Sequence, residues 1–145
     1  MIFSLAAFLL LSTSSAENSF AGKPYVKIRG SAFQVEIVRT NSEWQKGLMF
    51  REHLGPREGM FFWGTSERPQ SFWMKNTLIS LDIIYISKDL KIVSVQKNAV
   101  PLSEESLPSF KPATHILEVP GGTADHLGFK AGDKIELFGF KPKSP

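Results

Sequence analysis

Two carboxylates stand among apolar residues, where they could take part in acid–base chemistry. Asp82 is the one charged residue in the run 81–86, so its carboxylate must accept hydrogen bonds, pair with a cation or become protonated. Burial raises the pKa of such a carboxyl, which would make Asp82 a candidate general acid or base. We favour the alternative, a structural ion pair with Arg51 or Lys75 that fixes the packing of a neighbouring loop.

Glu118 is the second candidate for catalysis. It alternates with Leu117 and Val119, so on a strand its side chain points away from theirs and could face a cleft. Asp82 and Glu118 together would be the pair that glycoside hydrolysis requires, with carboxyls about 5 to 9.5 Å apart. Two independent carboxylates, solvated or ion-paired, are the interpretation that we favour.

A binding site is the main alternative to catalysis. Lys75 and Asn76 follow an aromatic segment that contains Trp73, and this group suits a sugar or a carboxylated ligand. A loop clamp in which Asn76 bonds nearby backbone explains the same residues equally well. The predicted ligand-binding residues are Arg51, Trp73, Lys75, Asn76 and Asp82.

Other chemistries lack their usual signatures in this sequence. His53, His115 and His126 are too far apart for a short metal motif, and His115 should point to the opposite face of a strand from Glu118. The chain has no cysteine, no phosphate-binding loop and no Gly-x-Ser-x-Gly elbow. We therefore expect neither a metal nor a cofactor.

Short strands and two short helices must position these residues. Apolar and polar residues alternate over 33–37, as in a half-buried strand. Thr40 and Glu43 are spaced as a capping box for a short helix that ends at Gly47. Further strands are expected at 60–63, 71–75, 81–86, 90–96, 114–119 and 134–138, with a helical turn at 123–127 closed by Gly128.

The pattern as a whole predicts an all-β fold. The strand at 81–86 should be central and covered on both faces, and it should form a hairpin with 90–96. The stretch 101–112 contains three prolines and is expected to be a surface loop. Many short strands, two short helices and no sustained helical period favour a compact sandwich or barrel.

The N-terminus has the form of a secretory signal peptide. Residues 2–11 are apolar except for Ser4, and Ser14 and Ala16 are small enough for a cleavage site. We expect residues 1–16 to be removed, so the mature protein would have no stable membrane span. The apolar run is also too short to cross a membrane by itself. An uncleaved anchor or a buried first strand is the alternative, since no Lys or Arg precedes the run. Residues 17–31 are then a lead-in, 32–139 a single β domain and 140–145 a tail.

The charge of the chain limits its partners. It carries 17 Lys and Arg against 14 Asp and Glu, and the signs alternate along the sequence. Nucleic-acid binding needs a concentrated basic stripe, so we expect no nucleic-acid partner. The remaining expectation is a monomer that takes a small-molecule or glycan ligand.

Several motifs occur together in one order: GLMFR at 47–51, FWMKNT at 72–77, LDII at 81–84, LEV at 117–119 and GD at 132–133. In these motifs the chain resembles the uncharacterised prokaryotic domain-of-unknown-function family 192, over about residues 32–139. The resemblance implies a compact, mostly β domain resembling a jelly roll, often behind a signal peptide, and it implies no activity. Ser80 and Leu90 depart from the proline and glycine that are commoner at these turns.

Three functional hypotheses follow for an exported protein of the periplasm or the extracellular space. The first is a non-catalytic cell-envelope binding domain. The second is a hydrolase or lyase of envelope glycans that uses Asp82 and Glu118. The third is a structural or assembly accessory protein. Convergence of the candidate side chains on one open concavity would separate the first two hypotheses from the third.

Overall fold

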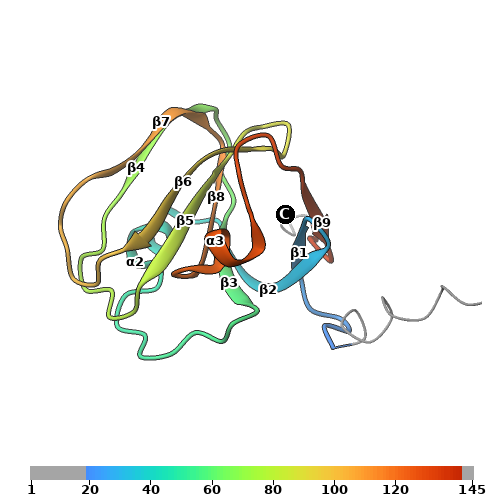
Figure 1. Ribbon diagram of the computed structural model, residues 1–145, viewed down its shortest axis with the longest axis horizontal. Helices are drawn as coiled ribbons and strands as arrows, with labels where there is room; N and C mark the ends of the chain where they lie inside the picture. The colour runs from blue at the N-terminus through green and yellow to red at the C-terminus, as the bar shows by residue number, and fades with distance from the viewer. Residues whose placement is uncertain (1–18, 142–145) are drawn as a thin grey trace, which may run out of the picture.

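The computed structural model describes residues 19–141, so the predicted signal segment 1–16 lies outside the described residues. The described chain is mainly β with two short helices, as the sequence predicts. Seven strands form one curled sheet, which Figure 1 shows as a half-barrel. In spatial order its strands are β6 (Ile92–Ala99), β5 (Leu81–Ile86), β8 (His115–Pro120), β3 (Glu58–Phe62), β2 (Ser31–Val38), β1 (Tyr25–Ile28) and β9 (Ile135–Phe138).

One strand pair sets the topology of the sheet. β2 and β3 are parallel, whereas the other neighbours in the sheet are antiparallel. A parallel pair requires a crossover connection, and here it carries the short helix α2 (Asn41–Lys46). At the far edges, a bridge between Lys91 and Lys134 brings the β5–β6 turn against the start of β9. The strands therefore curl into a half-barrel and do not divide into the two four-stranded sheets of a jelly roll.

A two-stranded sheet lies beside the half-barrel. It pairs β4 (Arg68–Phe72) with β7 (Leu107–Ala113), as Figure 1 shows. The prediction of a loop over 101–112 was wrong, because β5 and β6 side chains bind the backbone of β7: Ser94 Oγ donates to the Ser109 carbonyl at 2.7 Å, and Tyr85 Oη donates to that of Leu107. Prolines are tolerated in β7 because it pairs with β4 alone. The predicted strand 71–75 was also misplaced, since β4 ends at Phe72.

The other predicted elements are confirmed. Thr40 and Glu43 form the capping box of α2, and Gly47 follows the helix at φ 47°. The second helix, α3 (Thr123–Leu127), ends at Gly128 in the left-handed conformation. β5 is buried along its whole length and pairs with β6 as a hairpin. The segment 17–31, by contrast, was expected to be a lead-in outside the β domain, but it supplies β1, which pairs with both β2 and β9.

The two faces of β5 and β8 belong to different cores. One core contains Ile84, Leu117 and Val119 and is closed by Ala124 of α3. The other contains Ile83, Tyr85 and Ile116 and is closed by α2 and the two-stranded sheet, through partly buried side chains that include Trp44, Phe72 and Leu107. Because alternate residues of a strand point to opposite faces, adjacent residues of β5 enter different cores.

Candidate functional site

Asp82 is a structural residue of the first core. Its side chain is fully buried and accepts three backbone N–H groups. Asn98 N–H donates to Oδ1 at 2.8 Å, Gly122 N–H to Oδ1 at 3.1 Å, and Ala124 N–H to Oδ2 at 2.7 Å. The carboxylate thereby joins β6, the turn after β8 and the first turn of α3, which has no side-chain cap of its own.

The predicted ion pair of Asp82 with Arg51 or Lys75 was wrong. Arg51 forms a two-pronged pair with Glu36 of β2, and this interaction raises the pKa of Arg51 and lowers that of Glu36. Lys75 Nζ lies 3.7 Å from Glu104 and 5.0 Å from the centre of the Trp73 ring. Backbone N–H groups bind the Asp82 carboxylate instead. The types of the neighbouring residues do not predict this, because every residue except proline carries such a group.

Asp82 and Glu118 point to opposite faces of the sheet. In the register of β5 and β8, Asp82 lies opposite Val119 and Ile83 lies opposite Glu118. Directly opposed residues share a face, so Glu118 enters the second core while Asp82 enters the first. This pair cannot flank one glycosidic bond, and the hydrolase hypothesis that depended on it does not hold.

Glu118 is a largely buried residue whose carboxyl oxygens keep some contact with solvent. Its relative exposure is 5%, and no residue between 19 and 141 forms a hydrogen bond or an ion pair with its side chain. Burial raises the pKa of Glu118 to about 8, and no neighbouring cation counteracts this. The same carboxyl contributes to the raised pKa of Tyr85, which is caused first by burial. Glu118 is therefore protonated in much of the folded population at neutral pH.

A pocket opens onto this carboxyl. It has a volume of about 260 Å³ and lies between α2, the loop after it, β4 and the end of β8. Three of its aromatic rings pack edge to face: Trp44 against Phe62 at 5.4 Å and 78°, and Phe62 against Phe72 at 5.0 Å and 79°. Such contacts fix the rings in place and give the pocket a rigid apolar wall. Trp73 and Met49 extend that lining.

Gly47 leaves room for the carboxyl in this pocket. A Cβ at this position would lie 3.4 Å from Phe62 Cζ and 3.9 Å from Glu118 Oε2. Its positive φ of 47° also disfavours a residue with a side chain. The sequence predicts Gly47 as the end of a helix, and the structure shows that Gly47 also borders the candidate site.

Two of the predicted site residues line the pocket. These are Trp73 and Glu118, whereas Arg51, Lys75, Asn76 and Asp82 lie elsewhere. Sequence reasoning missed Trp44 and Phe72 as pocket walls because aromatic residues in a small β domain are usually core. It missed the polar rim, formed by Gln45, Lys46, Arg68, Gln70, Ser71 and Thr77, because this rim depends on the unpredicted pairing of β4 with β7.

The histidines are dispersed. His115 lies on the opposite face from Glu118, as predicted, where it packs 4.8 Å from Trp63 and accepts a hydrogen bond from Gly64 N–H. Across residues 19–141, no group of three or more His, Cys, Asp or Glu side chains is arranged to hold a metal ion. None of the helices in this range is long and apolar enough to cross a membrane.

A family comparison agrees with the motifs. The DUF192 family, described as Uncharacterized ACR, matches residues 25–137. The chain belongs to the DUF192 family. The match begins at the first residue of β1 and includes Gly47, Trp73 and Glu118 of the candidate site. No curated protein matches the chain.

Two solved structures are similar to this DUF192 protein. A protein of unknown function from Novosphingobium aromaticivorans DSM 12444 is 43% identical, with a TM-score of 0.74, over 77% of this chain and 83% of that chain. A protein from Sinorhizobium meliloti 1021, described as a candidate transcription regulator, is 35% identical, with a TM-score of 0.77, over 81% of this chain and 95% of that chain. The fold is thus shared, and these comparisons assign no activity to it.

Proposed function

We propose that this DUF192 protein is a non-catalytic domain that binds a small molecule in the pocket above Glu118. The observation that carries the proposal is a buried carboxyl with no partner among the described residues, at the wall of an open pocket. Among residues 19–141, every fully buried side-chain N or O atom has a hydrogen-bond partner, so the unpaired oxygens of Glu118 reach the pocket, where they require a partner from outside the protein. A ligand that bonds to Glu118 supplies it.

Binding is favoured over hydrolysis because the pocket contains one acidic residue. Glu118 is the sole Asp or Glu in its lining, and acid–base hydrolysis of glycosides requires two carboxyls. The remaining lining combines an apolar wall, with aromatic rings, and a polar rim, which is the usual composition of a small-molecule site. A ring wall fixed by edge-to-face contacts also reduces the ordering that a ligand would have to induce.

We also propose that the protein acts outside the cytoplasm, in the periplasm or the extracellular space. Support comes from the sequence of residues 1–16, with its short apolar run and its small residues at Ser14 and Ala16. Mass spectrometry of the protein purified from its own cells should find a chain that begins after Ala16. An intact Met1 in the mature protein would contradict export by cleavage.

A thermal-shift screen of the mature protein tests the binding proposal. A ligand present at 100 times its Kd should stabilise the protein by about 2.7 kcal/mol. Glu118→Gln should weaken the ligands that the screen finds, whereas Glu136→Gln, an exposed acid on β9, should not. A screen of metabolites and cell-envelope fragments that finds no ligand, or ligands indifferent to Glu118→Gln, would refute the proposal.

A further inference from the structure

The charges that face the pocket point to a class of ligand. We infer that the pocket binds a small zwitterion, with its cationic group against Glu118 and its anionic group between Lys46 and Arg68 at the rim. This inference rests on the proposed function, because it requires that the pocket is a binding site. It goes further by naming the charges that a ligand must carry at each end.

The neutral polar side chains of the pocket are mostly engaged within the protein. Gln70 donates from Nε2 to the Ala113 carbonyl at 3.3 Å, Ser71 Oγ lies 2.6 Å from Ser106 Oγ, and Thr77 Oγ1 donates to the Lys75 carbonyl at 3.2 Å. Most of the neutral amide and hydroxyl side chains in the lining are therefore occupied within the protein. Within residues 19–141 Gln45 is the exception, and the indole N–H groups of Trp44 and Trp73 also have no acceptor, so a neutral, hydroxyl-rich ligand such as a sugar would find one free amide and two free donors.

The charged side chains of the pocket are, by contrast, free. Among residues 19–141, Lys46, Arg68 and Glu118 have neither a hydrogen bond nor an ion pair through their side chains. Lys46 and Arg68 are exposed and Glu118 is buried. The unsatisfied groups are thus one acid inside and two cations at the entrance.

The buried end suits a cationic group. Aromatic rings attract cations through their faces, and an adjacent carboxylate adds a full opposite charge in a water-poor setting. Trp44 and Phe72 are partly exposed and supply the accessible rings near Glu118, while Phe62 is fully buried and supports them from behind. Such a site needs few hydrogen-bond donors.

The entrance suits an anionic group. Lys46 ends α2 and Arg68 begins β4, so cations approach the rim from two elements. A carboxylate or phosphate can accept charge-assisted hydrogen bonds from both. A ligand with a cation alone would have to pass these two charges without compensation. A volume of about 260 Å³ is at the small end for ligand sites, which favours a compound the size of an amino acid.

Three matched compounds test both ends of the ligand. Glycine betaine has a quaternary ammonium and a carboxylate, 3,3-dimethylbutyrate replaces the nitrogen with carbon, and choline replaces the carboxylate with a hydroxymethyl group. The free amino acids extend the panel to primary ammonium groups. In calorimetric titrations of the mature protein, we expect at least one zwitterion to bind and each charge-deleted analogue to bind at least about tenfold more weakly.

Measuring proton release on binding distinguishes a cationic ligand group at Glu118 from a neutral one. Because the pKa of Glu118 is about 8, a cation that favours its charged form should release close to one proton at pH 7. Titrations in buffers of different ionisation enthalpy measure this release. The titratable groups beside Glu118 are Lys46 and Arg68, which line the pocket, and Tyr85, which faces it from β5. Burial raises the pKa of Tyr85, so that side chain stays protonated. Glu118→Gln should abolish the release.

Two double variants test the contribution of the cations at the rim. Lys46→Gln combined with Arg68→Gln should weaken the zwitterion by about tenfold or more and leave choline unaffected or slightly stronger. Lys88→Gln combined with Lys111→Gln removes two cations that do not line the pocket and should change neither compound.

The binding data distinguish a failure of the zwitterion inference from a failure of the binding proposal. If a neutral sugar binds and no zwitterion does, or if 3,3-dimethylbutyrate binds as well as betaine, the inference is overturned while the binding proposal stands. Binding of a zwitterion without proton release, or without an effect of the rim variants, overturns it as well. If neither the panel nor the wider screen contains a ligand, both proposals fail.

Discussion

Two buried carboxylates on neighbouring strands have opposite surroundings. Asp82 of β5 accepts three backbone N–H groups and is closed in by α3, while Glu118 of β8 has no partner within residues 19–141 and borders a pocket. In the pairing of β5 with β8, Asp82 lies opposite Val119, the residue after Glu118. The two acidic side chains therefore lie on opposite faces of the sheet. Burial is common to both, so burial does not distinguish a structural acid from a candidate ligand-binding one.

Hydrogen-bond satisfaction does distinguish them. A carboxylate with a full set of donors contributes to the fold, whereas a largely buried carboxyl with no donor from the described residues loses part of its hydration on folding and lowers stability when it is ionised. Proteins often retain such unfavourable groups at functional sites, where stability and function compete. The contrast can be tested by changing each acid in turn.

Removal of Asp82 should have the largest effect. Asp82→Ala leaves three backbone donors buried without an acceptor, so the free energy of unfolding should fall by at least about 3 kcal/mol. Asp125→Ala is the control, because Asp125 is an exposed acid on α3 whose pair with Lys97 contributes little. Urea unfolding of both variants measures the difference. A loss below 1 kcal/mol for Asp82→Ala would show that water replaces its hydrogen bonds.

The pH dependence of stability should report Glu118. Its pKa is about 8 in the folded protein and near 4.5 when unfolded, so between these values only the folded state holds the proton. Stability should therefore fall as pH rises from about 4.5 to 8, by up to about 1.4 kcal/mol per pH unit from this group, and level off above 8. Unfolding curves of wild type and Glu118→Gln at matched pH values isolate the contribution. Parallel profiles would show that Glu118 is ionised in the fold.

Replacement of Glu118 by an apolar residue should stabilise the protein. Glu118→Met keeps the length of the side chain and removes an unpaired polar group, so the free energy of unfolding at pH 8 should rise by about 1 to 3 kcal/mol. Glu136→Met, at an exposed position, should change stability by less than about 0.5 kcal/mol. If Glu118→Met instead destabilises the protein, the carboxyl supports the fold and the contrast with Asp82 disappears.

The smallest effect is expected at Lys75. Its pair with Glu104 is 3.7 Å long and exposed, so Lys75→Ala should cost at most about 0.5 kcal/mol. In a double-mutant cycle with Asp82→Ala the two changes should add within about 0.5 kcal/mol, because the side chains share no contact. Strong coupling between positions 75 and 82 would restore the ion pair that the sequence suggested.

Local signals predicted most of the elements. The alternation at 33–37, the capping box at Thr40 and the covered run at 81–86 each depend on neighbouring residues, and each gave the correct element. β7 was missed because its prolines resemble a loop, and its stability comes from side chains of β5 and β6 that are distant in sequence. β1 is held by partners on both sides, which a local pattern does not reveal.

The candidate site was predictable only in part. The alternation around Glu118 correctly separated it from Leu117 and Val119, and Trp73 was chosen for its aromatic ring beside polar residues. The partners of Asp82 were not predictable, because backbone donors can come from any part of a chain. The cations at the rim, Lys46 and Arg68, come together through the crossover after β2 and the pairing of β4 with β7, which are tertiary features.

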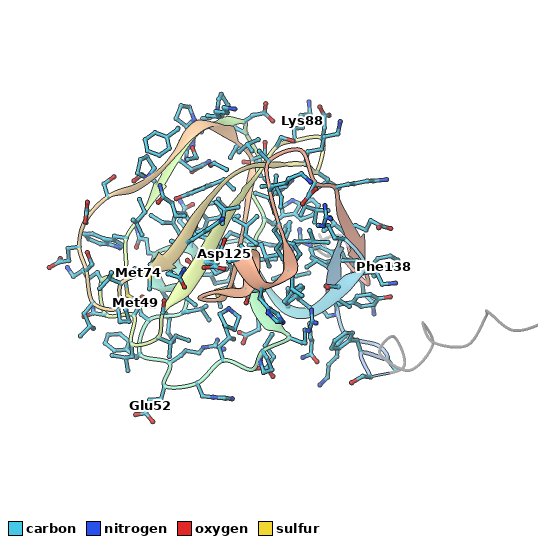
Figure 2. The ribbon with its side chains drawn as sticks, in the orientation of Figure 1. Met49, Glu52, Met74, Lys88, Asp125 and Phe138 are labelled. Atoms are coloured by element: carbon cyan, nitrogen blue, oxygen red, sulfur yellow. The ribbon has the colours of Figure 1, made fainter. Side chains whose placement is uncertain are left out.

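The pairing of β1 with β9 has a practical consequence for handling the protein. Tyr25 lies opposite Phe138, so the two ends of the folded region are adjacent. Figure 2 places Phe138 on the opposite side of the molecule from Met49, which lines the pocket. A tag, a fusion partner or a surface attached at either end should therefore leave the pocket accessible. A short linker between the two ends would also allow a circular permutant, in which new termini could be opened in an exposed loop.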